Sequence, residues 1–380
     1  LYACLRPLLW LHFHTATQAA QCMSCAFRRH DPERGSVRIR TVSEVLPPPQ
    51  HPLPKFEIAL PQPDISPWLA GNCGIEGVHH FEAPTPGPHA VITALMHGNE
   101  FAGAYALNTL LTQAIRPIRG RLSLIFLNIA AFTRFDPQRP TLSRFVEEDM
   151  NRLWCPELIR SRHMSIEMQR VRAICPIIET ADLLLDIHSM LWPGPPVLLS
   201  GLTTKSLMLG NRLSGLLPSQ PWVVQDAGHE NGPRLIDHAR FASNRTRATA
   251  CLLEAGQHWQ PESQATATQA AALFLLQAGL IAPDALPTMG LAPVTQAIPA
   301  VAQPPCPARH ATVTHCVLAH TSGFAFVKPF TNGALIRKKG TLLALDGQDE
   351  IRTPYNNCLL VMPNLRPLRG HTAVRLAKPG

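Results

Sequence analysis

Two apolar runs in this chain end in side chains that bind metal ions. His97 and Glu100 follow the run 89–95, where a strand is expected to give way to a helix, and His188 closes the run 181–188. Imidazole nitrogens and a carboxylate oxygen are the usual protein ligands of a catalytic zinc ion, which keeps one further position open. The pattern predicts a hydrolytic zinc site with one Zn2+ per chain and these three residues as ligands.

Asp186 stands two residues before His188 in the same run. Side chains at positions i and i+2 of a strand point to the same face, and a carboxylate there could orient the imidazole of a metal ligand. It could equally be a carboxylate at the edge of the core. The sequence leaves both readings open.

The segment 143–154 carries Arg144 and Arg152, separated by three acidic residues and Asn151. A guanidinium group binds a carboxylate through two parallel hydrogen bonds, and a neighbouring amide adds another. This arrangement is a candidate anion-binding site. The alternative is a charged surface segment whose ion pairs are internal.

Glu254 closes a third apolar run, 248–256, and small residues follow it. A metal-bound water needs a nearby base to take its proton, and a half-buried carboxylate suits that task. We therefore expect Glu254 to serve a catalytic function rather than to lie at a solvated strand edge.

Apolar strand-like and helix-like runs alternate through the middle of the chain, which predicts an α/β fold with a sheet covered on both faces. Strands are expected at 89–95, 121–132, 181–188, 196–200 and 248–256, and helices at 99–114, 165–179 and 263–280. Short β-type runs punctuated by glycine and asparagine fill 310–378 and predict a small all-β domain.

These patterns suggest four segments. Residues 1–54 are expected to be a disordered or non-native extension, 55–282 a hydrolase domain, 283–309 a Pro/Ala-rich linker and 310–380 the β domain.

The formal net charge is +8, but the excess lies at the ends: residues 1–60 carry 7 Lys/Arg against 4 Asp/Glu, and residues 328–380 carry 9 against 3. The near-neutral middle argues against nucleic-acid binding. No run approaches the roughly 18 apolar residues of a membrane span, so no membrane partner is expected. The 10 cysteines have no disulfide-like rhythm, and Cys22 and Cys25 lack a second pair. A reducing, cytoplasmic location is expected.

Four motifs occur in an order that resembles the aspartoacylase and succinylglutamate desuccinylase family, relatives of the zinc carboxypeptidases. They are MHGNEFAG, RFVEEDMNRLW, LLLDIHS and LLEAGQH. The resemblance covers about residues 56–280 and extends to the C-terminal β domain. It implies a zinc-carboxypeptidase-like three-layer α/β/α mixed sheet with a small C-terminal all-β domain.

The resemblance also implies a role for each matched residue. His97, Glu100 and His188 would be the zinc ligands and Glu254 the catalytic base. Arg144 would polarise the scissile carbonyl, and Asn151 and Arg152 would bind a substrate carboxylate. A further substrate arginine matches Arg245 or Arg247, and Tyr355 is the candidate for a tyrosine that closes the site.

The function expected from this resemblance is zinc-dependent removal of the acyl group from an N-acyl amino acid or a similar small carboxylate. A zinc carboxypeptidase acting on short peptides is the nearest alternative. A non-catalytic relative that binds zinc or a carboxylate is the alternative from another class. The acyl group, the amine and the oligomeric state, with a homo-oligomer among the expectations, stay open.

Overall fold

The computed structural model describes residues 53–229, 231–292 and 309–380. The extension expected over residues 1–54 lies almost entirely outside these ranges, as does most of the linker expected over 283–309.

Within the described residues, the strands form two sheets. A mixed sheet of 11 strands has the order β1-β3-β2-β4-β7-β5-β6-β8-β14-β13-β10, and a second sheet has the antiparallel order β12-β11-β9. The strands are β1 (Val78–Glu82), β2 (His89–Ala94), β3 (Arg121–Phe126), β4 (Leu183–Met190), β5 (Val197–Ser200), β6 (Trp222–Gln225), β7 (Thr249–Gln257), β8 (His310–Leu318), β9 (Ala325–Phe326), β10 (Leu335–Ile336), β11 (Leu342–Asp346), β12 (Asp349–Arg352), β13 (Cys358–Val361) and β14 (Thr372–Pro379). The predicted mixed α/β architecture is confirmed at this level.

The α-helices of the described residues lie in the first two of the three described ranges. They are α1 (Ala102–Thr112), α2 (Ile129–Phe132), α3 (Pro156–Arg160), α4 (Ile166–Ile178), α5 (Thr204–Leu216), α6 (Ala239–Ala242) and α7 (Pro261–Gln277). Short 3-10 helices lie at η1 (Ser66–Trp68), η2 (Leu142–Arg144), η3 (Met150–Arg152), η4 (Leu235–Asp237), η5 (Pro283–Ala285) and η6 (Pro287–Met289).

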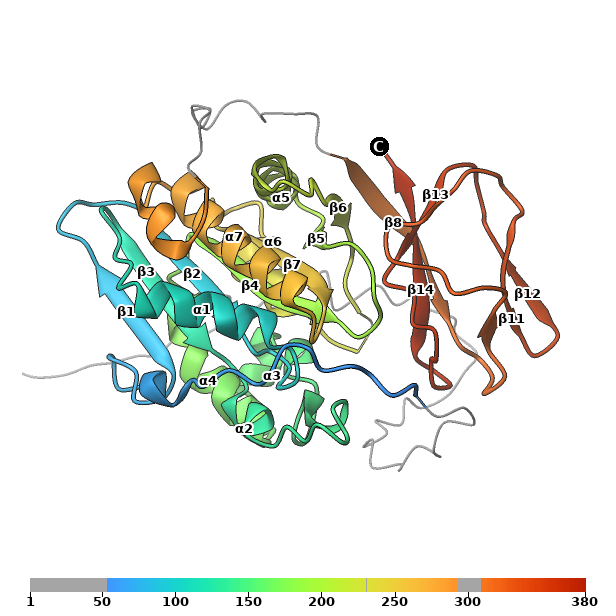
Figure 1. Ribbon diagram of the computed structural model, residues 1–380, viewed down its shortest axis with the longest axis horizontal. Coiled ribbons are helices and arrows are strands. Elements are labelled where there is room, and N and C mark those ends of the chain that lie inside the picture. Colours follow the sequence, from blue (N-terminus) through green and yellow to red (C-terminus); the bar gives the residue numbers. More distant parts are fainter. Residues whose placement is uncertain (1–52, 230, 293–308) are drawn as a thin grey trace, which may run out of the picture. The chain divides into compact units, whose positions relative to one another are not determined.

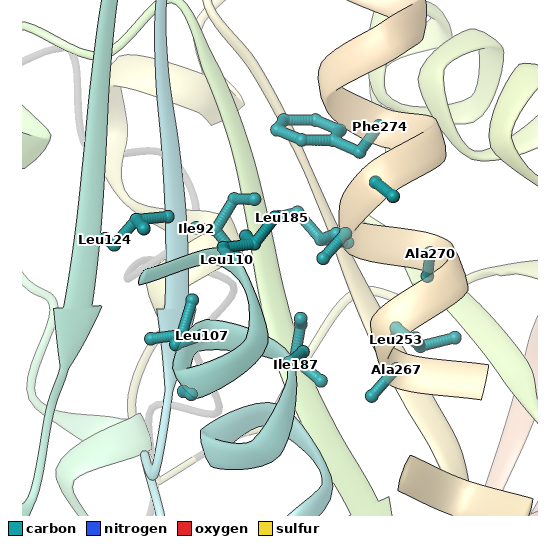
Figure 2. Close-up of a cluster of buried hydrophobic side chains, with 14 of the residues drawn as sticks. Ile92, Leu107, Leu110, Leu124, Leu185, Ile187, Leu253, Ala267, Ala270 and Phe274 are labelled. Atoms are coloured by element: carbon teal, nitrogen blue, oxygen red, sulfur yellow. The ribbon is translucent and has the colours of Figure 1, made fainter. Parts of the chain in front are cut away.

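The central strands β3, β2, β4 and β7 are parallel and buried on both faces, because helices cover each side. On one face α1 packs beside α7 (Figure 1). Figure 2 shows side chains of both helices meeting those of the strands, among them Leu107, Phe274, Ile92 and Leu185. Burial of each side chain of this size stabilises the folded state by about 1.5–3 kcal/mol.

The opposite face of the central strands is covered by α4. Its Met168, Val171 and Ile174 recur at helical spacing and are fully buried with Val91 and Leu184 of the strands. The two apolar layers fix the sheet, and hence the positions at which its strands end.

The strands at the C-terminal end of the chain continue the large sheet. Strand β8 pairs in parallel with β6 through Val223↔His310, Val224↔Ala311 and Gln225↔Thr312. Strands β14, β13 and β10 extend the sheet beyond β8, and β9, β11 and β12 form the small sheet. The β-rich part expected over 310–380 is therefore joined to the preceding part by backbone hydrogen bonds.

Two expected boundaries differ from the structure. The strand expected over 121–132 ends at Phe126, because the side chain of Asn128 accepts a hydrogen bond from Ala131 N at 3.1 Å and begins α2. The helix expected over 99–114 begins only at Ala102, so Glu100 lies in the preceding loop instead of the first helical turn.

Strands β1 and β6 and helices α3, α5 and α6 were not predicted from the sequence. Among the described helices, none has the length and apolar character needed to cross a membrane.

Candidate active site

The candidate catalytic residues gather where β2, β4 and β7 end. Strand β2 lies between β3 and β4, so the chain passes from β2 to β3 on one side and then crosses to β4 on the other side. A crevice outside the carboxyl ends of strands at such a switch point is the usual ligand site of an open α/β sheet. His188 and Glu254 are direct partners in the β4–β7 register, which places their side chains on the same face.

The loop that carries His97 and Glu100 is held close to two neighbouring segments. Gly98 N donates to Arg144 O at 3.0 Å. A Cβ at Gly98 would lie 2.3 Å from the carbonyl carbon of Ala131 and 2.5 Å from Ser143 O, so only glycine fits here. The glycine of this motif therefore brings His97 and Glu100 next to the segment that bears Arg144.

His97, Glu100 and His188 meet as predicted. His97 Nδ1 lies 2.7 Å from Glu100 Oε1, and His188 Nδ1 lies 3.0 Å from Glu100 Oε2. All three residues are at most 3% exposed. Their ligand atoms lie within 4.8 Å of one another, close enough for this group to hold a metal ion.

The other nitrogen of each ring is held by an aspartate. Asp186 Oδ2 lies 2.9 Å from His188 Nε2, and Asp149 Oδ1 lies 3.0 Å from His97 Nε2. Asp186 is itself held by Thr93 Oγ1, which donates to Asp186 Oδ1 at 2.6 Å. Of the two readings of Asp186, the structure supports the orienting one. The contact of Asp149 was not foreseen.

Charges reinforce one another inside this cluster. Burial opposes the charge of Glu100, but the two histidines hold its pKa well below the usual range. Burial likewise opposes protonation of His188, but Asp186 and Glu100 hold its pKa well above the usual range. The arrangement stabilises a positive charge between the imidazoles and the carboxylate.

Glu254 lies beside this cluster, and its pKa is shifted in the opposite direction to that of Glu100. Burial, and then the charge of Glu100, raises the pKa of Glu254 to about 8. Glu254 is 5% exposed, and within the described residues no hydrogen-bond partner reaches its Oε2 atom. A carboxyl group with such a pKa can both take and give a proton near neutral pH.

Arg144 lies at the rim of the cluster, with 39% of its side chain exposed. Its Nη1 lies 3.2 Å from Glu100 Oε1 and its Nη2 lies 3.3 Å from Asp149 Oδ2. The guanidinium group therefore reaches the metal-ligand candidates while it remains open to a small molecule.

A buried carboxylate from α4 fixes the loop that bears Arg144 and Asp149. Glu167, which is fully buried, accepts hydrogen bonds from Val146 N at 2.7 Å, Glu147 N at 3.2 Å and Glu148 N at 3.4 Å. Asn128 Nδ2 donates to the same carboxylate at 3.1 Å. One side chain thus satisfies three backbone amides of a segment without regular structure.

Glu167→Ala is expected to lower the free energy of unfolding by about 2–4 kcal/mol, because it leaves partly buried amide groups without an acceptor. Urea denaturation followed by circular dichroism measures this change. Glu262→Ala, at an exposed position in the first turn of α7, is the matched control. A variant at Glu167 as stable as the control would show that water replaces the carboxylate at no cost.

Asn151 and Arg152 adjoin Asp149 on η3. Asn151 Oδ1 accepts a hydrogen bond from Leu235 N at 2.9 Å, which fixes the amide so that its Nδ2 is left to donate. Arg152 is held by Asn151 O at 2.7 Å and, more loosely, by Asp149 at 3.5 Å. Burial, and then the nearby arginines, lowers the pKa of Arg152 to about 10, so it stays charged at neutral pH.

Arg245, Arg247 and Tyr355 are not brought to this cluster. Arg245 and Arg247 are exposed and precede β7, whereas Glu254 lies near its other end. At about 3.3 Å per residue, the strand alone separates them from Glu254 by more than about 15 Å. The Tyr355 hydroxyl instead lies 2.6 Å from Thr314 Oγ1, and its ring packs on the cluster around Phe330.

Two other buried arginines lie closer to the site, and the sequence analysis missed them. Arg234 Nη1 and Arg375 Nε both lie 3.1 Å from Asp226 Oδ2. Arg375, on β14, also donates to the ring of His229 at 2.8 Å. Burial and the charges of Arg152, Arg375 and Arg234 lower the pKa of His229 to about 2. No local sequence signal joins these residues, because they come from separate segments.

Glu100 has a further contact that the sequence analysis missed. Ser189 N donates to Glu100 Oε2 at 3.1 Å, and Ser189 Oγ lies 2.8 Å from His258 Nδ1. The register of β4 and β7 brings this pair together beside the candidate ligands.

Comparison with known proteins agrees with this geometry. Residues 86–191 match the family model described as the succinylglutamate desuccinylase/aspartoacylase catalytic domain. Residues 86–191 therefore resemble the catalytic domain of this family. The matched segment contains His97, Glu100, Arg144, Asn151, Arg152 and His188, and it ends before Glu254. This similarity supports a hydrolase that removes acyl groups.

Solved structures share the fold at low sequence identity. The succinylglutamate desuccinylase from Vibrio cholerae has a TM-score of 0.55 and 17% identity, over 80% of this chain and 86% of that one. The enzyme of the same name from Chromobacterium violaceum has a TM-score of 0.55 and 17% identity, over 80% and 89%. The product-bound ectoine utilization protein EutE (DoeB) from Ruegeria pomeroyi has a TM-score of 0.52 and 17% identity, over 79% and 87%. A search of curated protein sequences finds no match.

Proposed function

We propose that this protein is a zinc-dependent hydrolase that removes the acyl group from an N-acyl amino acid or a similar small carboxylate. One observation carries the proposal: the Nδ1 atoms of His97 and His188 face the two oxygens of Glu100, while Asp149 and Asp186 hold both Nε2 atoms. An imidazole whose second nitrogen is held by a carboxylate is the usual form of a metal-ligating histidine.

His97, Glu100 and His188 would hold one zinc ion per chain. Two imidazole nitrogens and one carboxylate match the ligand set of hydrolytic zinc sites. When bound, zinc supplies a Lewis acid that polarises a carbonyl group and lowers the pKa of water.

Glu254 moves the proton in this mechanism. Its carboxylate takes a proton from the attacking water, whose oxygen forms the new bond to the amide carbon. The same proton passes to the leaving nitrogen as the carbon–nitrogen bond breaks, so that a carboxylic acid and an amine are released. A carboxyl group buried without a partner on Oε2 can accept and return a proton without breaking an existing hydrogen bond there.

Arg144 stabilises the negative charge that develops on the carbonyl oxygen. Its guanidinium group is already placed by Glu100 and Asp149, so little reorganisation is needed. A preorganised donor of this kind typically lowers the activation free energy by about 2.7–4 kcal/mol.

Asn151 and Arg152 bind the carboxylate of the substrate. The amide of Asn151 is fixed with its Nδ2 left to donate, and Arg152 lies among other cations and forms a long ion pair of 3.5 Å with Asp149. This local excess of positive charge favours an anion. We therefore propose a small carboxylate as the substrate class.

Arg152→Gln is expected to raise KM by about 10–100-fold with little change in kcat, since a hydrogen bond to a charged group contributes about 1.5–3 kcal/mol. Steady-state kinetics on an N-acyl amino acid measure this change. The control is the same substrate with its carboxylate converted to an amide, on which wild type and variant should perform equally. An equal loss on both substrates would remove Arg152 from carboxylate binding.

The function itself is tested by offering the zinc-loaded protein N-acyl amino acids of different acyl length and charge, side by side with dipeptides. We expect hydrolysis of at least one N-acyl amino acid, and loss of this activity on treatment with a chelator. Faster cleavage of the dipeptides would identify a carboxypeptidase. Zinc binding with no hydrolysis of any compound would identify a non-catalytic relative.

A further inference from the structure

A second cluster of metal-ligating side chains lies at the other end of the central strands. It consists of Cys175, Glu179 and His238, whose ligand atoms lie within 4.8 Å of one another. Helix α4 ends just before β4 begins, whereas His188 lies near the far end of that strand. At about 3.3 Å per residue, about 16 Å of strand separates this cluster from the candidate catalytic residues.

The fold positions all three side chains. Cys175 and Glu179 are one helical turn apart at the end of α4, so they lie on the same face. His238 is the N-cap residue of α6, and its ring packs edge-to-face on Phe241 with 6.3 Å between ring centroids. Cys175 is 7% and His238 4% exposed, whereas Glu179 faces solvent.

We propose that Cys175, Glu179 and His238 form a second metal site, which binds zinc or another divalent cation of similar softness. A thiolate, an imidazole and a carboxylate together select zinc over magnesium or calcium, which prefer oxygen ligands. The exposed side of Glu179 leaves room for water as a fourth ligand.

Metal binding must displace a proton from the thiol. Burial, and then the charge of Glu179, raises the pKa of Cys175 to about 11, so the free thiol is protonated and is a poor nucleophile. On binding, the sulfur–metal bond forms and the thiol proton passes to solvent. Burial lowers the pKa of His238, so the imidazole is neutral and can act as a ligand.

His238 also has a competing contact. Its Nδ1 accepts a hydrogen bond from Arg240 N at 3.4 Å, which leaves Nε2 for the metal. Coordination at Nε2 would place the ring proton on Nδ1 and would break this long hydrogen bond. The free energy of metal binding must exceed the loss of this weak hydrogen bond.

The site joins segments that support the catalytic cluster. Helix α4 carries Glu167, which holds the loop of Arg144 and Asp149. His238 directly follows η4, whose Leu235 N fixes Asn151. A metal ion here would therefore link the end of α4 to the η4–α6 segment and stabilise the protein without taking part in catalysis.

Cobalt substitution separates the two sites, because only this one contains sulfur. We expect the full chain, stripped of metal and titrated with Co2+, to bind cobalt at both sites and to develop the near-ultraviolet charge-transfer band of a cobalt–thiolate bond. Cys175→Ser should lose the band and bind one cobalt ion fewer. Cys73→Ser, which removes an exposed cysteine, should retain both.

Further variants test which residues coordinate the metal. Glu179→Gln changes an exposed residue, so it should fold normally and bind the thiolate-coordinated cobalt at least 10-fold more weakly. His188→Ala should lose the other cobalt ion and keep the band, so failure of the catalytic site and failure of this site are distinguishable. No thiolate band in wild type would overturn the proposal. So would a band that survives Cys175→Ser and disappears from Cys22→Ser/Cys25→Ser.

Discussion

Replacing Glu254 with glutamine is expected to abolish turnover while the protein still binds zinc. Glutamine has nearly the same shape but cannot take a proton from water, and general base catalysis of this kind typically contributes about 10²–10⁴-fold. Glu254 is not one of the three candidate metal ligands, so the metal site should survive the change. The measurements are kcat on the best N-acyl amino acid and zinc content by elemental analysis.

The matched control for this variant is Glu262→Gln, at an exposed position in the first turn of α7. It makes the same chemical change outside the site and should leave kcat unaltered. Full activity of the Glu254→Gln protein would remove Glu254 from the mechanism. Loss of zinc from it would instead make Glu254 part of the metal site.

Replacing His188 with alanine is expected to remove the metal and, with it, all activity. The change deletes one of three ligands and leaves the buried Asp186 without its partner. Elemental analysis of the purified variant should find one zinc ion fewer per chain than in wild type. His163→Ala, at an exposed histidine, is the control and should retain wild-type zinc. The same zinc content in the folded His188→Ala protein as in wild type would contradict the ligand assignment.

Asp186→Asn tests the same site without deleting a ligand. Asparagine keeps the shape but holds the imidazole less strongly, and loss of such an orienting carboxylate typically lowers metal affinity by about 10–100-fold. Competition with a chelator of known affinity measures the change. Unaltered affinity would mean that the contact between Asp186 and His188 does not tune the metal site.

The sequence predicts best where structure depends on neighbours along the chain. The apolar runs around 89–95 and 248–256 are strands because they are long and uninterrupted, and parallel strands end at the same edge of a sheet. That is enough to bring His97, His188 and Glu254 together. The helical turn at 129–132 escaped prediction because one side chain, Asn128, decides it within an apolar run.

Residues placed by long-range packing could not be predicted. Asp149 reaches His97 only because Gly98 and Glu167 hold the intervening loops together. Arg245 was predicted to bind substrate because it precedes Glu254 by a few residues in the chain. The intervening residues belong to an extended strand, β7, so Arg245 lies far from the site. The pairing of β6 with β8 likewise joins two short runs far apart in sequence.

We propose that the cluster of His97, Glu100 and His188 makes this protein a zinc-dependent deacylase. The most direct test is to remove all metal with a chelator, confirm its absence, and follow hydrolysis of an N-acyl amino acid as zinc is returned. We expect no hydrolysis by the metal-free protein and recovery of turnover as zinc is added. Full turnover by the metal-free protein would show that its activity does not depend on zinc.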